Sequence, residues 1–430
     1  MRRLLRFACV IWLLAGAVLL SAVAPAHAGD PRDLAGAPAA VRRALFRAET
    51  ARHQGDLETA QRLLAEALAG SPANDHAALR HRLGAYLLEL NRSGEALPHL
   101  RRAGALAPGE DEVWRDLGRA AYETGAYTEA ATAFTRAYRV ASARRQDSDR
   151  VAGTPRGAPG HPAPDPLLLY FGGVAWLQAD RPDSALAVLE TLATAAPDTV
   201  AQEWVAALVS AAAAADQPRR ADSGVARLLR DHPQRAAAWR LASQQAQLAG
   251  DLSLAAVRLQ VSDWLAPLPP AELPHLAELQ AAAGAPRRAA RAYARAMAAG
   301  WCGTSAADQP IESTVERLAV AWLQAHEPDS ARVVLREELT IQPIQRLYLL
   351  LGDLEYGIQR WDQAAAAYLQ AAELVPDEGR AWLMLGACEV RRQRPAAAAE
   401  YLKRAADDSA TAAQARSLLR QLAAAGSGRY

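Results

Sequence analysis

Residues 113–139 read VWRDLGRAAYETGAYTEAATAFTRAYR, and this stretch contains the pattern that decides the fold. Its second half places Ala130, Phe134 and Ala137 at the spacing small-x3-large-x2-small. Small residues let two helices approach closely, and a large residue between them fills the groove of the facing helix. The stretch therefore predicts two helices that pack against each other.

The same small-large-small pattern recurs along the chain, in most cases with a proline five residues after its last small position. Proline ends a helix because it has no backbone N–H. The pattern begins at Ala60, Ala96, Ala130, Ala185, Ala221, Ala255, Ala289, Ala331, Ala364 and Ala398. Successive starts are 33 to 36 residues apart, except for one step of 55 and one of 42 residues. This spacing predicts a tandem array of about ten two-helix units.

The array also explains a near-duplication within the chain. Residues 175–189 read AWLQADRPDSALAVL and residues 321–335 read AWLQAHEPDSARVVL, with eleven of fifteen positions identical. The two segments lie 146 residues apart, which is four steps of the array. We interpret them as one unit used twice, in which Pro182 and Pro328 open the second helix, where a missing N–H costs little.

Residues 41–410 resemble the tetratricopeptide repeat (TPR) family. The family signature is W-x2-L-G-x2-Y…A-x3-F…P over 34 residues. Its positions are matched by Trp114, Leu117, Gly118, Ala130 and Phe134, and again by Trp382, Leu385 and Gly386. The resemblance implies an all-α fold, a right-handed superhelical solenoid of about ten helix-turn-helix units whose first helices line a concave groove.

The two long steps predict interruptions of the array. Residues 143–165 are rich in proline, glycine and charge, which favours one long flexible linker. A shorter connector is expected at residues 301–311. The expected organisation is repeats 1–3 at 41–142, repeats 4–7 at 166–300, repeats 8–10 at 312–410 and a C-terminal capping helix at 411–424.

Residues 1–28 have the composition of a secretory signal peptide. Arg2, Arg3 and Arg6 precede the apolar run FACVIWLLAGAVLLSAVA, and AHA at residues 26–28 has the A-x-A form of a cleavage site. The mature chain is expected to begin at Gly29, without a membrane span, in the periplasm or outside the cell. The alternative is an uncleaved anchor, because the apolar run is nearly long enough to cross a bilayer.

Composition excludes some functions and supplies no catalytic motif. The formal net charge is +1, so no basic surplus indicates nucleic-acid binding. No H-E-x-x-H, G-x-S-x-G, G-K-[ST] or C-x-x-C occurs, and His76, His81 and His99 do not share one helical face. We therefore expect no enzyme, no cofactor and no metal site. Cys302 and Cys388 fall in different repeats, so we expect free thiols rather than a disulfide.

The function is then expected on the surface formed by the first helices of the repeats. The register predicts a protein-binding groove lined by His81, Arg115, Arg119, Tyr122, Tyr170, Val174 and Leu177. A groove that is polar at one end and apolar at the other suits an extended peptide or a partner helix. The other interpretation is that these charges only keep the surface soluble. The paired Lys and Asn of the family's chaperone-tail clamp are absent, so that binding mode is not expected.

Residues 239–265, 273–297, 347–372 and 380–390 also resemble exported TPR proteins encoded beside TonB–ExbB–ExbD systems of Gram-negative bacteria. This resemblance implies an exported scaffold that mediates protein–protein interaction in a cell-envelope complex linked to TonB-dependent energy transduction. Its partners would be proteins or peptides, including TonB-system components, and not nucleic acid. The alternatives are a structural component of an envelope assembly without an exchangeable ligand and, from another class, an enzyme.

Overall fold

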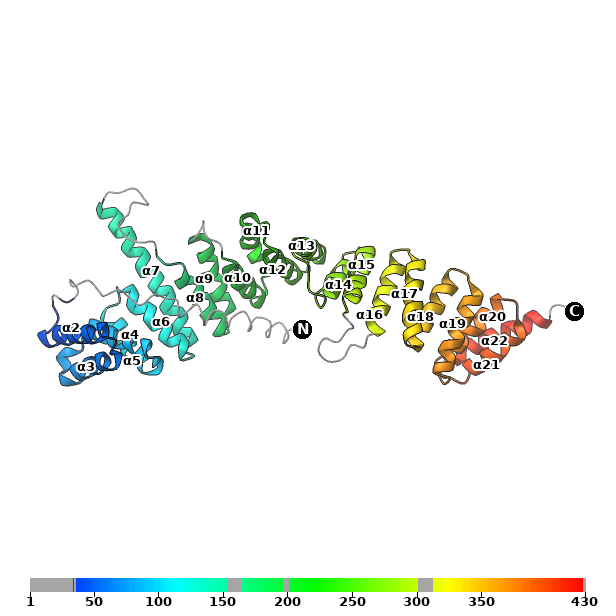
Figure 1. Ribbon diagram of the computed structural model, residues 1–430, viewed down its shortest axis with the longest axis horizontal. Coiled ribbons are helices and arrows are strands. Elements are labelled where there is room, and N and C mark those ends of the chain that lie inside the picture. The colour runs from blue at the N-terminus through cyan, green and yellow to red at the C-terminus, as the bar shows by residue number, and fades with distance from the viewer. Residues whose placement is uncertain (1–33, 35, 153–163, 196–200, 301–311, 428–430) are drawn as a thin grey trace. The chain divides into compact units, whose positions relative to one another are not determined.

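The computed structural model describes residues 34, 36–152, 164–195, 201–300 and 312–427. These residues form α-helices and short 3-10 helices and contain no β-strand (Figure 1). The expected all-α fold of stacked helix pairs is therefore confirmed. None of the described helices combines the length and the apolar character needed to cross a membrane. The expected signal peptide at 1–28 and the connector at 301–311 lie outside the described residues.

Contacts between Cα atoms divide the chain into two compact units, Met1–Pro233 and Gln234–Tyr430. The helices of unit 1 are α2 (Ala39–His53), α3 (Leu57–Gly70), α4 (Ala77–Glu89), α5 (Ser93–Leu106), α6 (Asp111–Glu123), α7 (Tyr127–Ala152), α8 (Leu167–Gln178), α9 (Pro182–Ala195), α10 (Gln202–Ala214) and α11 (Asp222–Asp231). Short 3-10 helices η2 (Pro72–Asn74) and η3 (Pro218–Ala221) lie between them. Each even-numbered helix packs against the odd-numbered helix that follows it, which gives five repeats.

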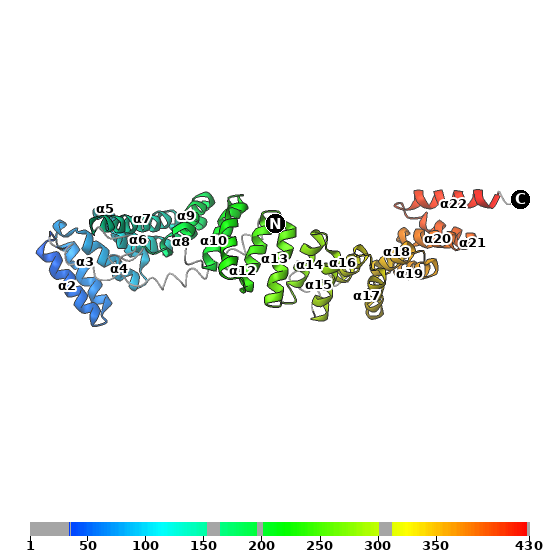
Figure 2. The same cartoon turned by 90° about the horizontal axis from the view of Figure 1, so that it is seen from above.

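Unit 2 contains five further repeats and one terminal helix. Its helices are α12 (Ala236–Leu248), α13 (Leu252–Leu265), α14 (Leu273–Ala282), α15 (Pro286–Ala298), α16 (Glu312–Gln324), α17 (Pro328–Ile341), α18 (Gln345–Gly357), α19 (Trp361–Leu374), α20 (Gly379–Arg391), α21 (Pro395–Ala405) and α22 (Ala412–Ser427). Helix α22 follows the last repeat at the C-terminal end of the chain (Figure 2). It packs on α21, where its Ala415 joins the cluster that contains Leu402 and Ala405.

The positions that defined the repeat pattern form the interior of each helix pair. The ten leading alanines are fully buried, and the large residue of every repeat is buried as well. Gly118 of α6 lies so close to Phe134 of α7 that a Cβ atom on the glycine would stand 2.7 Å from the ring. Gly352 of α18 faces Tyr368 of α19 in the same way, at 2.6 Å. Glycine in the first helix and a large residue in the second therefore form one interlocking contact, repeated along the array.

The turn between the two helices of each repeat also has a repeated conformation. One residue in every such turn has positive φ: Gly55, Asn91, Gly125, Asp180, Asp216, Gly250, Gly284, His326, Gln359 and Gln393. Each lies five residues before the leading alanine of its repeat. The next residue donates its N–H to a carbonyl five positions back, as in Ala126 to Ala121 at 2.8 Å. This is the Schellman arrangement that ends a helix.

The stack continues past both segments expected to interrupt it. Helix α7 runs to Ala152, so residues 143–152 of the expected linker are helical, while residues 153–163 lie outside the described residues. The pattern has Ser142 where proline ends the other helices, so nothing stops α7 there. Helix α7 packs on α8, with the Phe134 and Phe171 rings 5.7 Å apart.

Helix α15 likewise packs on α16 across the segment expected to be a connector. Leu318 and Ala321 of α16 belong to the same buried cluster as Tyr293 of α15. The boundary between compact units instead falls between Pro233 and Gln234, inside the segment expected to hold repeats 4–7. Each compact unit holds five repeats, and the expected division into repeats 1–3, 4–7 and 8–10 stays a prediction.

Candidate functional site

The first helices of repeats 1 to 3 are joined by polar side-chain contacts. Tyr86 of α4 donates its hydroxyl to Glu49 of α2 at 2.7 Å, and Arg52 of α2 forms an ion pair with Glu89 of α4 at 3.2 Å. Burial and the Glu49 hydrogen bond raise the pKa of Tyr86 above its ordinary range, so the hydroxyl remains a donor. These contacts fix the spacing of α2 and α4. The four side chains bind one another and are therefore not free to bind a partner.

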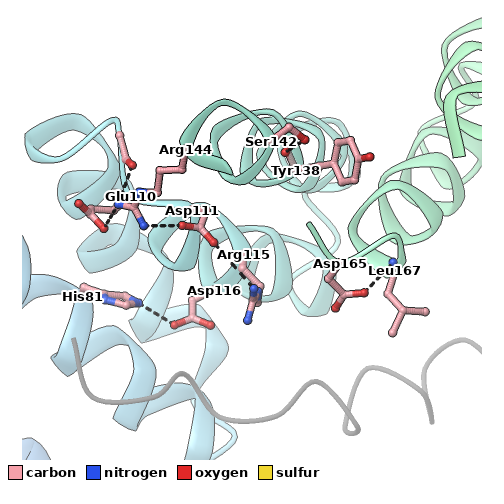
Figure 3. Close-up of polar contacts among 11 residues, drawn as sticks. His81, Glu110, Asp111, Arg115, Asp116, Tyr138, Ser142, Arg144, Asp165 and Leu167 are labelled. Carbon is pink, nitrogen blue, oxygen red and sulfur yellow. Dashed lines mark hydrogen bonds and ion pairs between the residues drawn. The ribbon is translucent and has the colours of Figure 1, made fainter. Parts of the chain in front are cut away.

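His81 is engaged in the next contact of this series. Its Nε2 lies 2.8 Å from Oδ2 of Asp116 on α6, and both side chains are only 14% exposed (Figure 3). His81 was predicted to line a binding groove. The structure places it between α4 and α6, where it joins two repeats.

Arg115 of α6 has a hydrogen-bond donor that no described residue accepts. Its nearest carboxylate is Asp111, at 3.9 Å, and its Nε is buried without an acceptor. Asp111 is held more closely by Arg144 of α7, whose Nη1 lies 2.9 Å from Oδ1, and Arg144 also pairs with Glu110 at 2.5 Å (Figure 3). Because Arg144 takes the carboxylate, the Arg115 guanidinium remains available to an acceptor from outside the chain.

Arg119 and Tyr122 continue the same side of α6. Arg119 lies four residues after Arg115 and forms an ion pair with Glu123 at 2.8 Å. Tyr122 is half-buried, with its ring edge-on to Tyr127 at 5.4 Å, and burial raises the pKa of its hydroxyl. Residues at i, i+4 and i+7 lie on one face of a helix. Arg115, Arg119 and Tyr122 therefore form a single row, which we call the α6 row.

Glu112 stands one residue outside the α6 row. It is half-buried, and no ion pair or hydrogen bond joins its side chain to another described residue. Burial raises the pKa of its carboxyl, against a smaller lowering effect of His81. The α6 surface thus holds two charged side chains one turn apart, Arg115 and Glu112, whose hydrogen-bonding groups are not all satisfied by described residues.

The apolar half of the predicted groove is not a surface. Tyr170 and Val174 of α8 are only 6% and 2% exposed, so both offer little surface to a partner, contrary to the exposed groove expected from the register. Helix α8 is apolar along most of its length and lies between α7 and α9, with Tyr170 packed on Phe171 at 5.5 Å. Leu177, near the end of α8, is half-buried. The structure therefore brings together Arg115, Arg119 and Tyr122 but not the apolar set.

Sequence reasoning missed Asp111, Asp116 and Arg144, which decide which side chains of this surface are free. The absence of proline at position 142 was a signal that α7 continues, and a longer α7 brings Arg144 back onto α6. In the part of the chain that the structure describes, no group of three or more His, Cys, Asp or Glu side chains could hold a metal ion.

Comparison with known proteins supports the repeat assignment. The family model described as tetratricopeptide repeat matches residues 81–148 and 349–413. The first segment runs from within α4 to within α7 in unit 1, and the second runs from within α18 to the first residues of α22 in unit 2. No curated protein sequence matches the chain.

Three solved structures are among those to which this chain is similar. A tetratricopeptide repeat protein from Parabacteroides merdae is 15% identical, with 66% of this chain and 99% of that chain covered and a TM-score of 0.34. YrrB, described as a TPR protein with an unusual peptide-binding site, is 17% identical, with 47% and 92% covered and a TM-score of 0.35. The MamA protein is 15% identical, with 45% and 93% covered and a TM-score of 0.35.

Proposed function

We propose that this chain, built on tetratricopeptide repeats, is a scaffold that binds other proteins, and that the α6 row of unit 1 is one of its binding surfaces. The observation that supports this proposal is the state of Arg115. Its Nε has no acceptor, and its nearest carboxylate lies 3.9 Å away and is held by Arg144. The Arg115 side chain keeps 23% of its surface exposed, so its guanidinium can donate hydrogen bonds to an incoming carboxylate.

The chemistry of the α6 row specifies the ligand class. A guanidinium offers donors in a planar fork that matches the two oxygens of a carboxylate. Arg119 lies one turn further along α6 and Tyr122 adds an aromatic ring with a hydroxyl donor, so the row fits an acidic segment of a partner protein. Arginine and tyrosine are both enriched among the residues that dominate binding energy.

We place this scaffold in the cell envelope of a Gram-negative bacterium, in the periplasm or outside the cell. Support comes from the basic and apolar pattern of residues 1–28 and the AHA sequence at 26–28. The resemblance to exported TPR proteins encoded beside TonB–ExbB–ExbD systems favours a partner from that machinery. The second candidate function is a fixed structural part of an envelope assembly, supported by His81 and Asp116, which join repeats rather than face outward.

Site-specific crosslinking in intact cells tests the binding surface. A photoreactive residue at Tyr122 is expected to capture a defined partner, identified by mass spectrometry. The same residue at Thr132, which is exposed on α7, is the matched control. Capture of a TonB-system component would support the pathway, and equal capture from both positions would contradict the α6 row.

Charge reversal then distinguishes a scaffold that binds an exchangeable partner from a fixed structural part of an assembly. Arg115→Glu with Arg119→Glu should weaken capture at least about tenfold, and added salt should weaken it further, because exposed charges are screened over about 8 Å at physiological ionic strength. The control Arg47→Glu with Arg139→Glu alters two exposed arginines in unit 1 that make no ion pair with a described residue. Capture that survives the first pair of changes would favour the fixed structural role.

Cell fractionation tests the proposed location. The chain is expected in the periplasmic or secreted fraction with Gly29 as its N-terminal residue. A chain that retains residues 1–28 and sediments with membranes would show that they serve as an anchor.

A further inference from the structure

Helix α13 of unit 2 exposes an apolar line to solvent. Leu254, Val257 and Trp264 are 39%, 54% and 72% exposed, at helical spacings of three and seven residues. Leu252 and Leu265 are exposed at the two ends of the same helix. Between its first and last residues, the only other exposed position of α13 is Ser253, so no exposed side chain within this helix is charged.

Core packing does not account for these residues. Helix α13 already buries Ala255, Ala256 and Leu259 in the cluster it shares with α14 and α15. Single exposed apolar residues are common, but several large ones on one side of a helix are typical of an interaction surface.

The neighbouring second helix, α15, exposes arginines at the matching positions. Arg288 and Arg291 stand 34 residues after Leu254 and Val257, one repeat further along the array. Both are exposed, and neither forms an ion pair with a carboxylate among the described residues. The equivalent face of two successive repeats therefore changes from apolar on α13 to basic on α15.

An ion pair joins helix α13 to helix α15. Arg295 of α15 donates to Asp263 of α13 from Nη1 at 2.7 Å and from Nη2 at 3.1 Å. Asp263 also accepts the backbone N–H of Leu268 at 3.1 Å, and although burial opposes ionisation, these hydrogen bonds bring the pKa of its carboxyl below the usual value. Such a bidentate pair fixes geometry as well as charge. The helix that carries the apolar line is thus tied directly to the helix that carries the arginine pair.

We propose that the outer surface formed by α13 and α15 docks an amphipathic helix of a partner protein that has an apolar face bordered on one side by acidic residues. The apolar face would cover Leu254, Val257 and Trp264, and the acidic border would meet Arg288 and Arg291. From Leu254 to Trp264 the line spans about 15 Å, which equals roughly three helical turns. Tryptophan and arginine are the residues most often found at the energetic centre of interfaces.

The restriction of the apolar line to α13 and of the unpaired arginines to α15 favours this partner over a lipid surface. A membrane offers anionic head groups all around an inserted apolar element. Here the unpaired arginines lie on α15 only, and the exposed positions of α13 carry no charge. A surface that is apolar along one line and basic along the next matches a helix that is apolar along one line and acidic along the next.

Binding of designed peptides to the full chain tests the proposal. The probe is a fluorescently labelled helical peptide of about five turns, with leucine at i, i+3, i+4 and i+7 and glutamate along one flank. A second peptide carries lysine in place of every glutamate. Fluorescence anisotropy should show the acidic peptide binding at least about tenfold more tightly than the basic one, because charge complementarity sets specificity.

Substitutions in the chain test the separate contributions of the arginine pair and the apolar line to peptide binding. Arg288→Glu with Arg291→Glu should reverse the preference between the peptides, whereas Val257→Ser with Trp264→Ser should weaken both. Arg416→Glu with Arg420→Glu on α22 is the matched control, since these arginines are exposed, lie one turn apart and form no ion pair with a described residue. Circular dichroism should be unchanged in every variant, because the altered side chains are exposed.

Several results would overturn the proposal. These are failure of the acidic peptide to bind, equal binding of both peptides, or a preference that survives the α15 reversal. Co-sedimentation with phosphatidylglycerol–phosphatidylcholine vesicles that requires the same residues would assign the surface to a membrane. Self-association that is lost in the Val257→Ser, Trp264→Ser variant would assign it to a second copy. Arg115→Glu with Arg119→Glu should not affect peptide binding, so this proposal and the α6-row proposal can fail separately.

Discussion

Replacing Gly118 with alanine tests the close approach of α6 and α7 in repeat 3. A Cβ atom at this position would lie 2.7 Å, 2.8 Å and 2.9 Å from three carbons of the Phe134 ring. Ordinary van der Waals contact starts at 3.4 Å. Phe134 is 1% exposed and its ring packs against Phe171, so it has little room to retreat. The added methyl group must therefore separate α6 from α7 or distort the ring packing.

The expected effect follows from two opposing contributions. Inserting a methyl group into a filled interior destabilises by about 1–3 kcal/mol. Alanine in place of glycine inside a helix stabilises by about 0.5–1 kcal/mol. We expect the overlap to win, with a net loss of about 1–2 kcal/mol, because the ring is enclosed on its far side.

Hydrogen exchange followed by mass spectrometry measures this loss locally. The chain has two compact units, so one global unfolding free energy would not describe it. Amides of α6 and α7 in the Gly118→Ala variant should exchange about tenfold faster, since 1.4 kcal/mol corresponds to a factor of ten. Gly94→Ala in α5 is the matched control: no atom lies within 4 Å of its added Cβ, so exchange there should be unchanged or slower.

Gly118→Ala and Gly94→Ala together test the contact between Gly118 and Phe134. Equal exchange rates for Gly118→Ala and the wild type would show that α6 and α7 do not interlock through this glycine. A second check adds Gly118→Ala to a Phe134→Leu background, where the smaller side chain leaves space for the methyl group. Contacting residues are not additive, so the alanine should cost less there than in the wild type. An unchanged cost would also contradict the contact.

Three further results are expected. Leu385→Ala should lower the stability of unit 2 by about 2–5 kcal/mol in urea unfolding, because the residue is buried, whereas the exposed Leu374→Ala should have little effect. Glu112→Gln should stabilise the chain at pH 7: burial raises the pKa of this carboxyl, so its ionisation on going above the ordinary pKa of about 4.3 opposes folding. That gain should vanish near pH 4, and an equal gain at both pH values would contradict it. Burial raises the pKa of the Cys388 thiol to about 12, so iodoacetamide at pH 8 should modify the 381–391 tryptic peptide only after unfolding; rapid modification of the folded chain would be the opposite result.

Helix content and repeat register could be predicted from local pattern alone. Ala130, Phe134 and Ala137 contact the partner helix of their own repeat, a short distance away in sequence, so their spacing specifies the pairing directly. The ten left-handed turn residues were not recognised, because six of them are not glycine, the residue usually found at such positions. Their constant distance from the leading alanine was nevertheless present in the sequence.

The candidate surface was predictable only in part. Arg115, Arg119 and Tyr122 were placed together correctly because one helical period determines their common face. Tyr170 and Val174 were placed on the same surface by register, yet α8 is enclosed by its neighbours and buries both. The packing of α7 on α8 and of α15 on α16 was not predictable either, since a long insert between two helices does not prevent them from packing.

The sequence by itself determined that this protein is an all-helical repeat array, because small and large residues at fixed spacing act within one helix pair. Only the tertiary structure decided which polar side chains are free. Arg144 reaches Asp111 from 33 residues away and thereby leaves Arg115 without a close partner. It also decided that the apolar line of α13 faces solvent beside the arginines of α15. Exposure and ion pairing depend on neighbours from other repeats, and the pattern within one repeat does not contain that information.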